Sequence, residues 1–319
     1  MTKILVTGGA GFIGSNLVRR LVHEGHAVRV LDDYSRSRPE RLQDIEQAIE
    51  LVQGDVRDFD QVDRATKGCE VVFHLAAVNG TENFYKHPDQ VLEVGIKGTM
   101  HTMDAAIKHG CRRYIFASSA EVYQEPTRCP TDERERLVVP DVTNPRLSYG
   151  GSKLIGELLS VHYLARHGIE AIAFRPHNIY GSDMGHEHVI PQFFARLCEL
   201  RRGGAPGPHP FPIQGDGTQT RAFCFIQDCI EGIMLLLAHG KSGEIYHVGN
   251  PTETSINNLA MLMAKIVGVQ IVLEPGSVPE GSTPRRCPAI SKVSALGFTP
   301  TVSLEQGLRI TYEQEWKPS

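Results

Sequence analysis

Residues 4–14 read Ile4-Leu5-Val6-Thr7-Gly8-Gly9-Ala10-Gly11-Phe12-Ile13-Gly14, and the amphipathic stretch 15–21 follows them. The apolar run predicts a buried strand, the glycines a tight turn, and the amphipathic stretch a helix. Residues 9–14 match the pattern G-x-G-x-x-G, which needs glycine where φ is positive and where the backbone approaches a ligand. Although such a turn can be a plain connection, this order directs backbone N–H groups and a helix dipole at a pyrophosphate. We therefore expect a dinucleotide site at Gly8, Gly11, Phe12, Ile13 and Gly14.

A second apolar run, residues 27–31, ends at Asp32. In dinucleotide-binding folds an acid about twenty residues after the glycines binds the adenosine ribose hydroxyls. A carboxylate there would repel a 2′-phosphate, so the sequence favours NAD over NADP. Arg36 and Arg38 lie nearby and leave the NADP alternative open.

The composition is that of an ordinary globular protein, with 41% hydrophobic and 22% charged residues in 319. The net charge of −4, without a dense basic block, argues against nucleic acid and membranes as partners. The chain runs from Met1 into the first predicted strand, so we expect no signal peptide. Seven cysteines without a C-x-x-C pair predict reduced thiols and a cytoplasmic location.

Further apolar runs alternate with helical patterns along the first half of the chain. The runs are 71–75, 114–118 and 171–175, and the helical patterns are 89–109 and 151–167. Strands that are apolar on both faces and alternate with helices predict a doubly wound parallel α/β sheet of the Rossmann type.

The pattern changes after residue 175, where we expect a smaller, mostly helical substrate domain. Its helices are predicted at 189–201, 255–267 and 303–315, and its loops at 203–212 and 275–288. We assign 1–178 and 223–248 to the NAD-binding domain, and 179–222 and 249–319 to the nucleotide-sugar substrate domain.

Ligands of such sheets bind beyond the carboxyl ends of the strands. The residues that follow the predicted strands are therefore further candidates for cofactor binding: Asp55, Val56, Leu75, Ala76, Ala77, Ser118 and Pro176. Asp55 is expected to face adenine, and the small side chains of Ala76 and Ala77 would let the cofactor pass closely.

Tyr149 and Lys153 lie four residues apart, on one face of a predicted helix start. An ammonium near a phenol favours the phenolate and lowers the pKa of the phenol. Tyr149 is therefore a candidate general base near neutral pH.

Eight ordered motifs together resemble the extended short-chain dehydrogenase/reductases of the nucleotide-sugar epimerase/dehydratase group. Besides residues 7–14, they are Gly54 to Asp58, His74 to Ala77, Ser118 to Tyr123, Tyr149 to Lys153, Arg175 to Gly181, Gly215 to Arg221 and Arg285 to Pro288. The resemblance covers nearly the whole chain.

The resemblance implies a tightly held NAD that takes hydride from C4 of a sugar and usually returns it in the same turnover. It implies that Tyr149 takes the C4 hydroxyl proton, that Lys153 binds the nicotinamide ribose, and that Ser119 hydrogen-bonds the reacting oxygen. It also implies that Asn178, Arg221 and Arg286, with Arg285 as a further candidate, bind the substrate diphosphate.

The reaction catalysed depends on Glu121. In similar dehydratases a glutamate at this place is the base at C5, often helped by a preceding aspartate, which is Ala120 here. We therefore predict an NAD-dependent nucleotide-sugar 4-epimerase that acts on an NDP-hexose. The alternative is a 4,6-dehydratase or decarboxylase that uses Glu121 at C5, and a non-catalytic nucleotide-binding protein is a third. A local structural role for Glu121 also stays open.

The resemblance also implies a homodimer that pairs the helices at 89–109 and 151–167. Two departures affect the site region: Gly95 stands where most relatives have asparagine, and Ala222 stands where an acid is usual. His186-Glu187-His188 with Asp183 could be metal ligands, but we favour a polar loop and predict no metal.

Overall fold

A computed structural model describes residues 1–204, 206–277 and 283–317. Its centre is a seven-stranded sheet in the order β11-β6-β5-β4-β1-β2-β3, in which every neighbouring pair is parallel. The strands are β1 (Lys3–Thr7), β2 (Ala27–Asp32), β3 (Ile49–Gln53), β4 (Val71–His74), β5 (Arg113–Ala117), β6 (Glu170–Pro176) and β11 (Ile245–Val248). The predicted doubly wound parallel sheet is confirmed.

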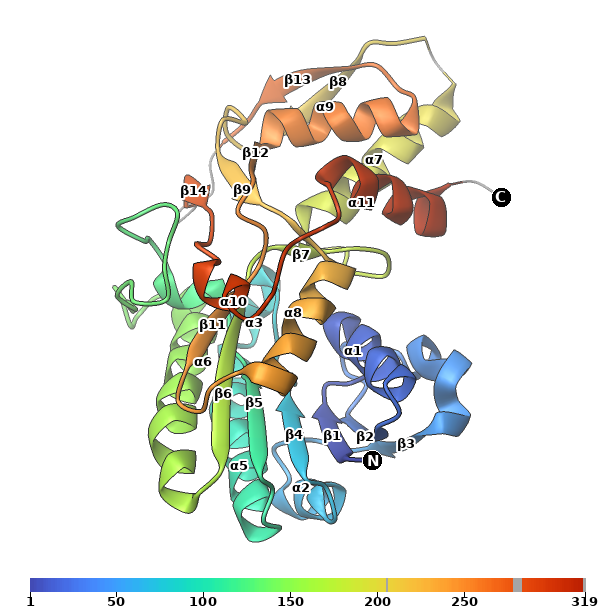
Figure 1. The fold of residues 1–319 in the computed structure, drawn as a ribbon. Coiled ribbons are helices and arrows are strands. Elements are labelled where there is room, and N and C mark those ends of the chain that lie inside the picture. Colours follow the sequence, from blue (N-terminus) through green and yellow to red (C-terminus); the bar gives the residue numbers. More distant parts are fainter. Residues whose placement is uncertain (205, 278–282, 318–319) are drawn as a thin grey trace.

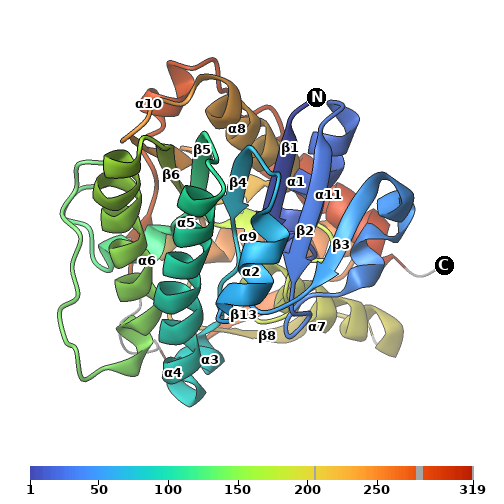
Figure 2. The ribbon, with the colours of Figure 1, turned by 90° about the horizontal axis from the view of Figure 1, so that it is seen from below.

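Helices cover both faces of this sheet (Figure 2). One face packs against α2 (Phe59–Thr66), α5 (Thr99–Lys108) and α6 (Ser148–Leu158), and the other against α1 (Phe12–His23) and α8 (Ile226–His239). The alternation along β1 shows why both faces are apolar, since Ile4 and Val6 join one core cluster and Leu5 joins the other.

Two longer helical segments contain irregular turns. The first consists of α4 (Pro88–Leu92), a π-helical turn over Glu93–Gly98, and α5. The second continues α6 through a π turn, Leu159–Tyr163, and a 3-10 turn, Leu164–His167. Both correspond to the predicted helices, and the short α3 (Thr81–Lys86) precedes the first of them.

The later part of the chain forms a group of helices and short strands above the sheet (Figure 1). Its helices are α7 (Val189–Gly203), α9 (Ile256–Val267) and α11 (Leu304–Thr311), the last followed by a π turn over Tyr312–Trp316. Its short strands pair as β7 (Ile179–Tyr180) with β10 (Cys224–Phe225), β9 (Thr220–Ala222) with β12 (Glu253–Ser255) and β14 (Arg285–Arg286), and β8 (His209–Ile213) with β13 (Ile271–Pro275). The short α10 (Ser291–Ser294) packs instead beside β11, at the edge of the sheet.

The prediction of a loop over 203–212 is wrong for its last residues, because β8 begins at His209. Pro210 and Pro212 are exposed while Phe211 is buried, so a strand of a two-stranded sheet tolerates both prolines. Part of the predicted loop over 275–288 falls on residues 278–282, outside the described residues; its end contains β14. The division into two domains stays a prediction.

No helix in the described ranges has the length and the apolar character needed to cross a membrane.

Candidate active site

The glycine turn joins β1 to α1 and leaves no room for side chains. Gly8 has a φ of +68°, and a Cβ there would lie 2.8 Å from the backbone nitrogen of Ala76. A Cβ at Gly14 would lie 2.2 Å from the carbonyl oxygen of Gly8. Gly11 is the N-cap of α1, and Phe12 and Ile13 are the first residues of that helix. The N–H groups of this first helical turn have no partner within the helix, so they are free to bind a ligand at the glycine turn. The turn therefore has the backbone approach and the helix end that a pyrophosphate needs.

A cleft opens beside this turn at the carboxyl ends of β1 to β4. The predicted cofactor residues Gly8, Gly11, Asp32, Val56, Leu75, Ala76 and Ala77 line it. Residues that the sequence analysis did not select line it as well: Leu31, Asp33, Ser35, Arg36, Ser37, Gly54, Val78 and Val94. Several of these directly follow β2, a position that could have drawn attention to them.

Asp32 is buried at the end of β2 and organises the loop that follows. One carboxylate oxygen accepts a hydrogen bond from the Ala10 N–H at 2.9 Å, and the other accepts from the Tyr34 N–H at 3.0 Å and from the Ser37 hydroxyl at 2.5 Å. The carboxylate therefore joins the glycine turn to the rim of the cleft, where it would repel a 2′-phosphate.

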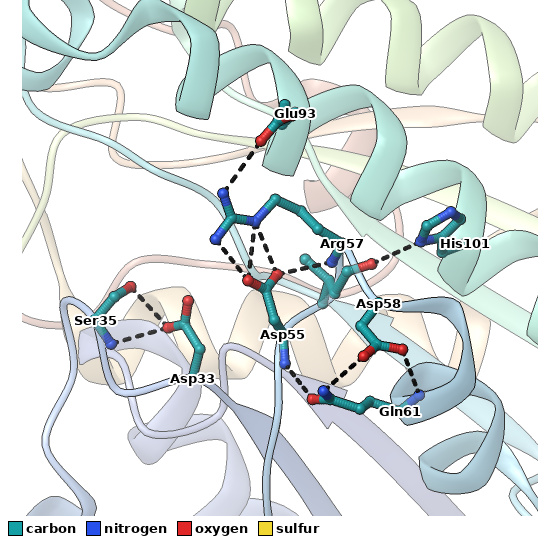
Figure 3. Close-up of polar contacts among 9 residues, drawn as sticks. Asp33, Ser35, Asp55, Arg57, Asp58, Gln61, Glu93 and His101 are labelled. Atoms are coloured by element: carbon teal, nitrogen blue, oxygen red, sulfur yellow. Dashed lines mark hydrogen bonds and ion pairs between the residues drawn. The ribbon is translucent and has the colours of Figure 1, made fainter.

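Asp55 lies at the adenine end of the expected cofactor site, but its carboxylate contacts protein. Figure 3 shows Arg57 between Asp55 and Glu93, with its Nη2 2.6 Å from Asp55 and its Nη1 3.2 Å from Glu93. The Val56 carbonyl contacts the His101 ring at 3.1 Å. Gly54 and Val56 line the cleft on either side, so a role of Asp55 with adenine stays a prediction.

Ser119, Tyr149 and Lys153 come together beside the cleft, where the cluster of Phe84, Val91 and Tyr149 packs against the cleft-lining Ala77 and Val78. Tyr149 stacks on Phe84 with ring centroids 5.1 Å apart, and the Ser119 side chain acts on the phenol and lowers its pKa. The Lys153 ammonium donates to the Ala117 carbonyl at 2.7 Å and lies 5.7 Å from the centroid of the Tyr149 ring. The structure thus brings the predicted catalytic side chains to one place.

The prediction that Lys153 lowers the pKa of the phenol is wrong for the protein alone. Burial raises the pKa of Tyr149 to about 12 and outweighs the hydrogen bond from Ser119, which lowers it. Burial also lowers the pKa of Lys153 to about 7, against the carboxylate of Glu157, which raises it. Lys153 therefore carries only part of a positive charge at neutral pH.

A buried ionic network lies next to these catalytic candidates, between α6 and β6. Glu157 and Arg175 form an ion pair at 2.6 Å with both side chains almost fully buried. The hydroxyl of Ser118, a residue predicted to bind the cofactor, donates a hydrogen bond to the Glu157 carboxylate. Pro176 ends β6 directly after this arginine. The sequence analysis missed the pair, although Glu157 lies one helical turn after Lys153 and so faces the same side.

Glu121 lies in a 3-10 turn, Ala120–Tyr123, and pairs with Arg286 of β14. Burial raises the pKa of Glu121, but the charge of Arg286 and its hydrogen bonds outweigh this, and the net pKa is lowered. Arg221 lies opposite Arg286 in the register of β9 and β14. Burial and the charge of Arg286 lower the pKa of Arg221 to about 10. Two arginines and one carboxylate therefore share a partly buried space with net positive charge.

Asn178 links this space to the end of the sheet. Its φ is +44°, a backbone region in which asparagine is enriched, and its side-chain amide donates to the Ala222 carbonyl at 3.2 Å. Ala222 itself is fully buried, which explains why its side chain is small.

The unusual Gly95 has a steric reason. A Cβ at this position would lie 2.5 Å from the Ser152 hydroxyl oxygen, and that hydroxyl donates to the Tyr149 carbonyl at 2.8 Å. Any side chain at residue 95, asparagine included, would displace Ser152. The close approach of the two helices thus depends on a glycine.

The acids of residues 183–188, which the sequence analysis considered as metal ligands, form ion pairs with arginines. Glu187 pairs with Arg36 at 2.5 Å, and Asp183 pairs with both Arg38 and Arg41. Both carboxylates are thus paired with arginines of the segment that follows β2. The same pairs engage the arginines that kept the NADP alternative open.

Comparisons with known proteins agree with this geometry. The model of the NAD dependent epimerase/dehydratase family matches residues 4–249. A UDP-N-acetyl-alpha-D-glucosaminuronate decarboxylase from Bacillus cytotoxicus is 31% identical over 98% of this chain and 97% of that protein. Among solved structures, a UDP-glucose 4-epimerase from Thermotoga maritima is 27% identical, with a TM-score of 0.85 over 98% of both chains. A dTDP-glucose 4,6-dehydratase from Streptomyces venezuelae, solved with NAD, is 28% identical, with a TM-score of 0.85 over 98% of this chain and 97% of that one.

Proposed function

The chain belongs to the NAD dependent epimerase/dehydratase family, and within that family of enzymes we propose that it is a nucleotide-sugar 4-epimerase. The observation that carries the proposal is the grouping of Ser119, Tyr149 and Lys153 beside the cleft, together with the pairing of Glu121 to Arg286. The first three suffice for oxidation and reduction at C4. Glu121, held as a carboxylate by Arg286, need not take part.

The cleft fits NAD, the cofactor of the family, for two reasons. The backbone of its glycine turn is not covered by side chains, and Asp32 lies on the cleft wall. When bound, NAD supplies a reversible hydride acceptor. Gly8, Gly11, Phe12, Ile13 and Gly14 would hold the pyrophosphate, and Asp32 the adenosine ribose.

In the proposed reaction Tyr149 acts as the phenolate, which accepts the proton of the C4 hydroxyl and later returns it. Ser119 hydrogen-bonds the same oxygen and stabilises it as it becomes a carbonyl. Lys153 holds the nicotinamide ribose. Epimerisation then requires the 4-keto sugar to rotate within the site, so that the hydride returns to the opposite face of C4.

Arg221, Arg286 and Asn178 would bind the substrate diphosphate. Guanidinium groups match phosphate oxygens geometrically, and Glu121 is the carboxylate that acts on this partly buried pair of arginines among the described residues. A diphosphate would therefore supply the negative charge that this space lacks.

A decarboxylase or dehydratase that uses Glu121 at C5 is the second candidate. The lowered pKa keeps Glu121 in the carboxylate form that a base needs, and the surplus of positive charge also suits an acidic sugar. A non-catalytic nucleotide-binding protein fits less well, because such a protein does not need Tyr149 and Lys153.

Product analysis decides among these reactions. The protein is incubated with UDP-, GDP-, dTDP- and CDP-hexoses and the corresponding uronic acids, and products are identified by NMR. We expect a C4 epimer; a 4-keto-6-deoxy sugar or release of CO2 would refute the epimerase. Glu121→Gln should retain epimerase activity to within about tenfold, whereas loss of a proton-transfer base typically costs about 10²- to 10⁴-fold. The exposed Glu125→Gln is the matched control.

We also propose a homodimer built on α4, α5 and α6. Of these helices, α4 exposes Leu92 by 40%, and α6 exposes Ile155 and Leu158 by 37% and 52%. Apolar side chains on neighbouring helices of a soluble fold favour burial against a second copy. Sedimentation should show a dimer, and Leu158→Glu a monomer; a monomeric wild-type protein would refute the dimer.

A cytoplasmic location is proposed from the cysteines. All seven, at positions 69, 111, 129, 198, 224, 229 and 287, are free thiols.

A further inference from the structure

Three side chains from distant parts of the chain place metal-binding atoms together. The Sγ atoms of Cys129 and Cys287 and a carboxylate oxygen of Glu253 all lie within 4.8 Å of one another. Cys129 Sγ is 4.0 Å from Glu253 Oε1, and Cys287 Sγ is 3.2 Å from the carbonyl oxygen of Pro251. Within the described part of the chain no other group of three or more His, Cys, Asp or Glu side chains meets this geometry.

Backbone hydrogen bonds bring the three segments together, independently of the side chains. The Thr131 N–H donates to the Cys287 carbonyl at 2.8 Å, and the Ala289 N–H donates to the Thr131 carbonyl at 2.7 Å. Glu253 begins β12, which pairs with β9, and β9 pairs with β14 just before Cys287. Backbone pairing therefore brings the three residues that carry the ligand atoms close together.

A second set of contacts orients the carboxylate. Arg285 donates to both oxygens of Glu253, with Nη2 at 2.5 Å and Nε at 3.1 Å, and the Thr220 hydroxyl donates to one of them. Hydrogen bonds of this kind around a ligand are typical of metal sites, where they fix its orientation. The Arg285 charge would also offset the excess negative charge of two thiolates and a carboxylate around a divalent ion.

We propose that Cys129, Cys287 and Glu253 bind a divalent cation of the zinc class. Thiolates select zinc over harder cations such as magnesium and calcium, and zinc accepts four ligands in a tetrahedron of sulfur, nitrogen and oxygen. The Pro251 carbonyl oxygen, 3.2 Å from Cys287 Sγ, is a candidate for the fourth ligand. Binding replaces the two thiol protons, so one cation taken up releases two protons.

The cation would cross-link the segment around Cys129 to the one that carries Arg286. Arg286 directly precedes Cys287 and reaches Glu121. The metal is therefore structural: it fixes the backbone on which a substrate-binding arginine is mounted and does not touch the reacting atoms.

Cobalt is the probe for this site. The full-length protein is reduced with a phosphine, stripped of metal and titrated with Co²⁺. We expect a thiolate-to-cobalt charge-transfer absorption that saturates at one ion per chain and disappears when Zn²⁺ is added. Cys129→Ser and Cys287→Ser should each abolish it, and Glu253→Gln should weaken Co²⁺ binding. Cys198→Ser, which removes a part-exposed thiol elsewhere, should leave it unchanged.

Thiol counting on the wild-type protein keeps the test valid if the Cys287 variant does not fold. Zinc should protect two thiols from a thiol reagent and raise the midpoint of thermal unfolding. The proposal is overturned if no charge-transfer absorption appears, if it persists in Cys129→Ser, or if zinc protects no thiol. Isolation of the protein with a disulfide between Cys129 and Cys287 would overturn it as well. None of these outcomes depends on which reaction the enzyme catalyses.

Discussion

At the scale of single residues, the phenol of Tyr149 is the group on which the proposed chemistry depends. It is 8% exposed and stacks on Phe84, and the Ser119 side chain lowers the pKa of its phenol. Burial and stacking restrict the motion of the ring, and such restriction favours catalysis when the restricted orientation is the productive one.

Tyr149→Phe should abolish turnover while the fold and the bound cofactor are retained. Because the variant loses the proton acceptor and nothing else, kcat/KM should fall about 10²- to 10⁴-fold. The amount of NAD released on denaturation should match that of the wild type. Tyr85→Phe removes the hydroxyl of a half-exposed tyrosine nearby and should keep full activity. Turnover in Tyr149→Phe would show that another group is the base.

Glu121 gives the protein an acid-sensitive contact. Its pKa in the folded protein lies below the ordinary value of 4.5, so the carboxylate binds protons more weakly in the folded than in the unfolded state. The stabilisation is therefore complete above pH 4.5 and is lost as the pH falls through the lower, folded-state pKa.

The thermal midpoint of Glu121→Gln should accordingly lie below that of the wild type at pH 7, and the difference should shrink as the pH falls below 4.5. Glu82→Gln removes an exposed pair with Lys86 and should change little at any pH, because water screens such pairs. A difference for Glu121→Gln that does not vary with pH would contradict the ion pair.

At the scale of elements, the contact between α6 and the segment Glu93–Gly98 sets the geometry of the site. Gly95 lies in the π turn of that segment and faces Ser152, one residue before Lys153. A π turn adds a residue to a helical turn and is common at functional sites. Here it lets two helices approach at a distance that no Cβ at residue 95 would allow.

Gly95→Ala should destabilise the protein by about 1–3 kcal/mol, because the new Cβ would overlap the Ser152 side chain. Ser152→Gly removes the obstructing atoms. The double variant should therefore be less destabilised than the sum of the two single variants, with a coupling of at least about 0.5 kcal/mol in urea unfolding. Strict additivity would mean that the two residues do not meet.

At the scale of the whole molecule, ion pairs join the loop after β2 to the loop before α7. Arg36 contacts Glu187, while Arg38 and Arg41 contact Asp183. Ser35, Arg36 and Ser37 of the first loop line the cleft. The pairs therefore link the rim of the cofactor site to the part of the chain that we assign to the substrate.

Removal of these pairs should speed the release of NAD. The three exposed pairs contribute about 0.2–1 kcal/mol each, so Asp183→Asn combined with Glu187→Gln should raise the dissociation rate by about 3- to 150-fold. Added salt should act in the same direction on the wild type and less on the variant. Glu231→Gln, which removes a pair with Arg20 of α1, is the control and should leave the rate unchanged. Equal rates in all proteins would show that the loops do not retain the cofactor.

Much of the fold could be predicted because the relevant signals are local. The glycines at 8, 11 and 14 and the apolar runs before and after them lie within a few residues of one another. Glycine spacing reports where a side chain cannot fit, and a run of apolar residues reports burial on both faces of a strand. β8 was missed because prolines usually mark a loop, and only its pairing with β13 makes it a strand.

The partners of the charged residues could not be predicted in this way. Arg286 lies 165 residues from Glu121, and the chain between them crosses the sheet before it returns. Arg36 and Glu187 are 151 residues apart, and Cys129 and Glu253 are 124 apart. The pattern of residues near each of them is compatible with exposure to solvent, so it carries no information about a partner.

The sequence by itself determined the parallel sheet and the glycine turn, because short-range spacing dictates both, and the resemblance of its motifs supplied the side chains to which we assign the chemistry. Only the tertiary structure decided that Glu121 pairs with Arg286, that burial raises the pKa of Tyr149, and that two cysteines meet one glutamate. These properties arise from packing, since the distance between two groups and their access to water depend on how distant segments fit together.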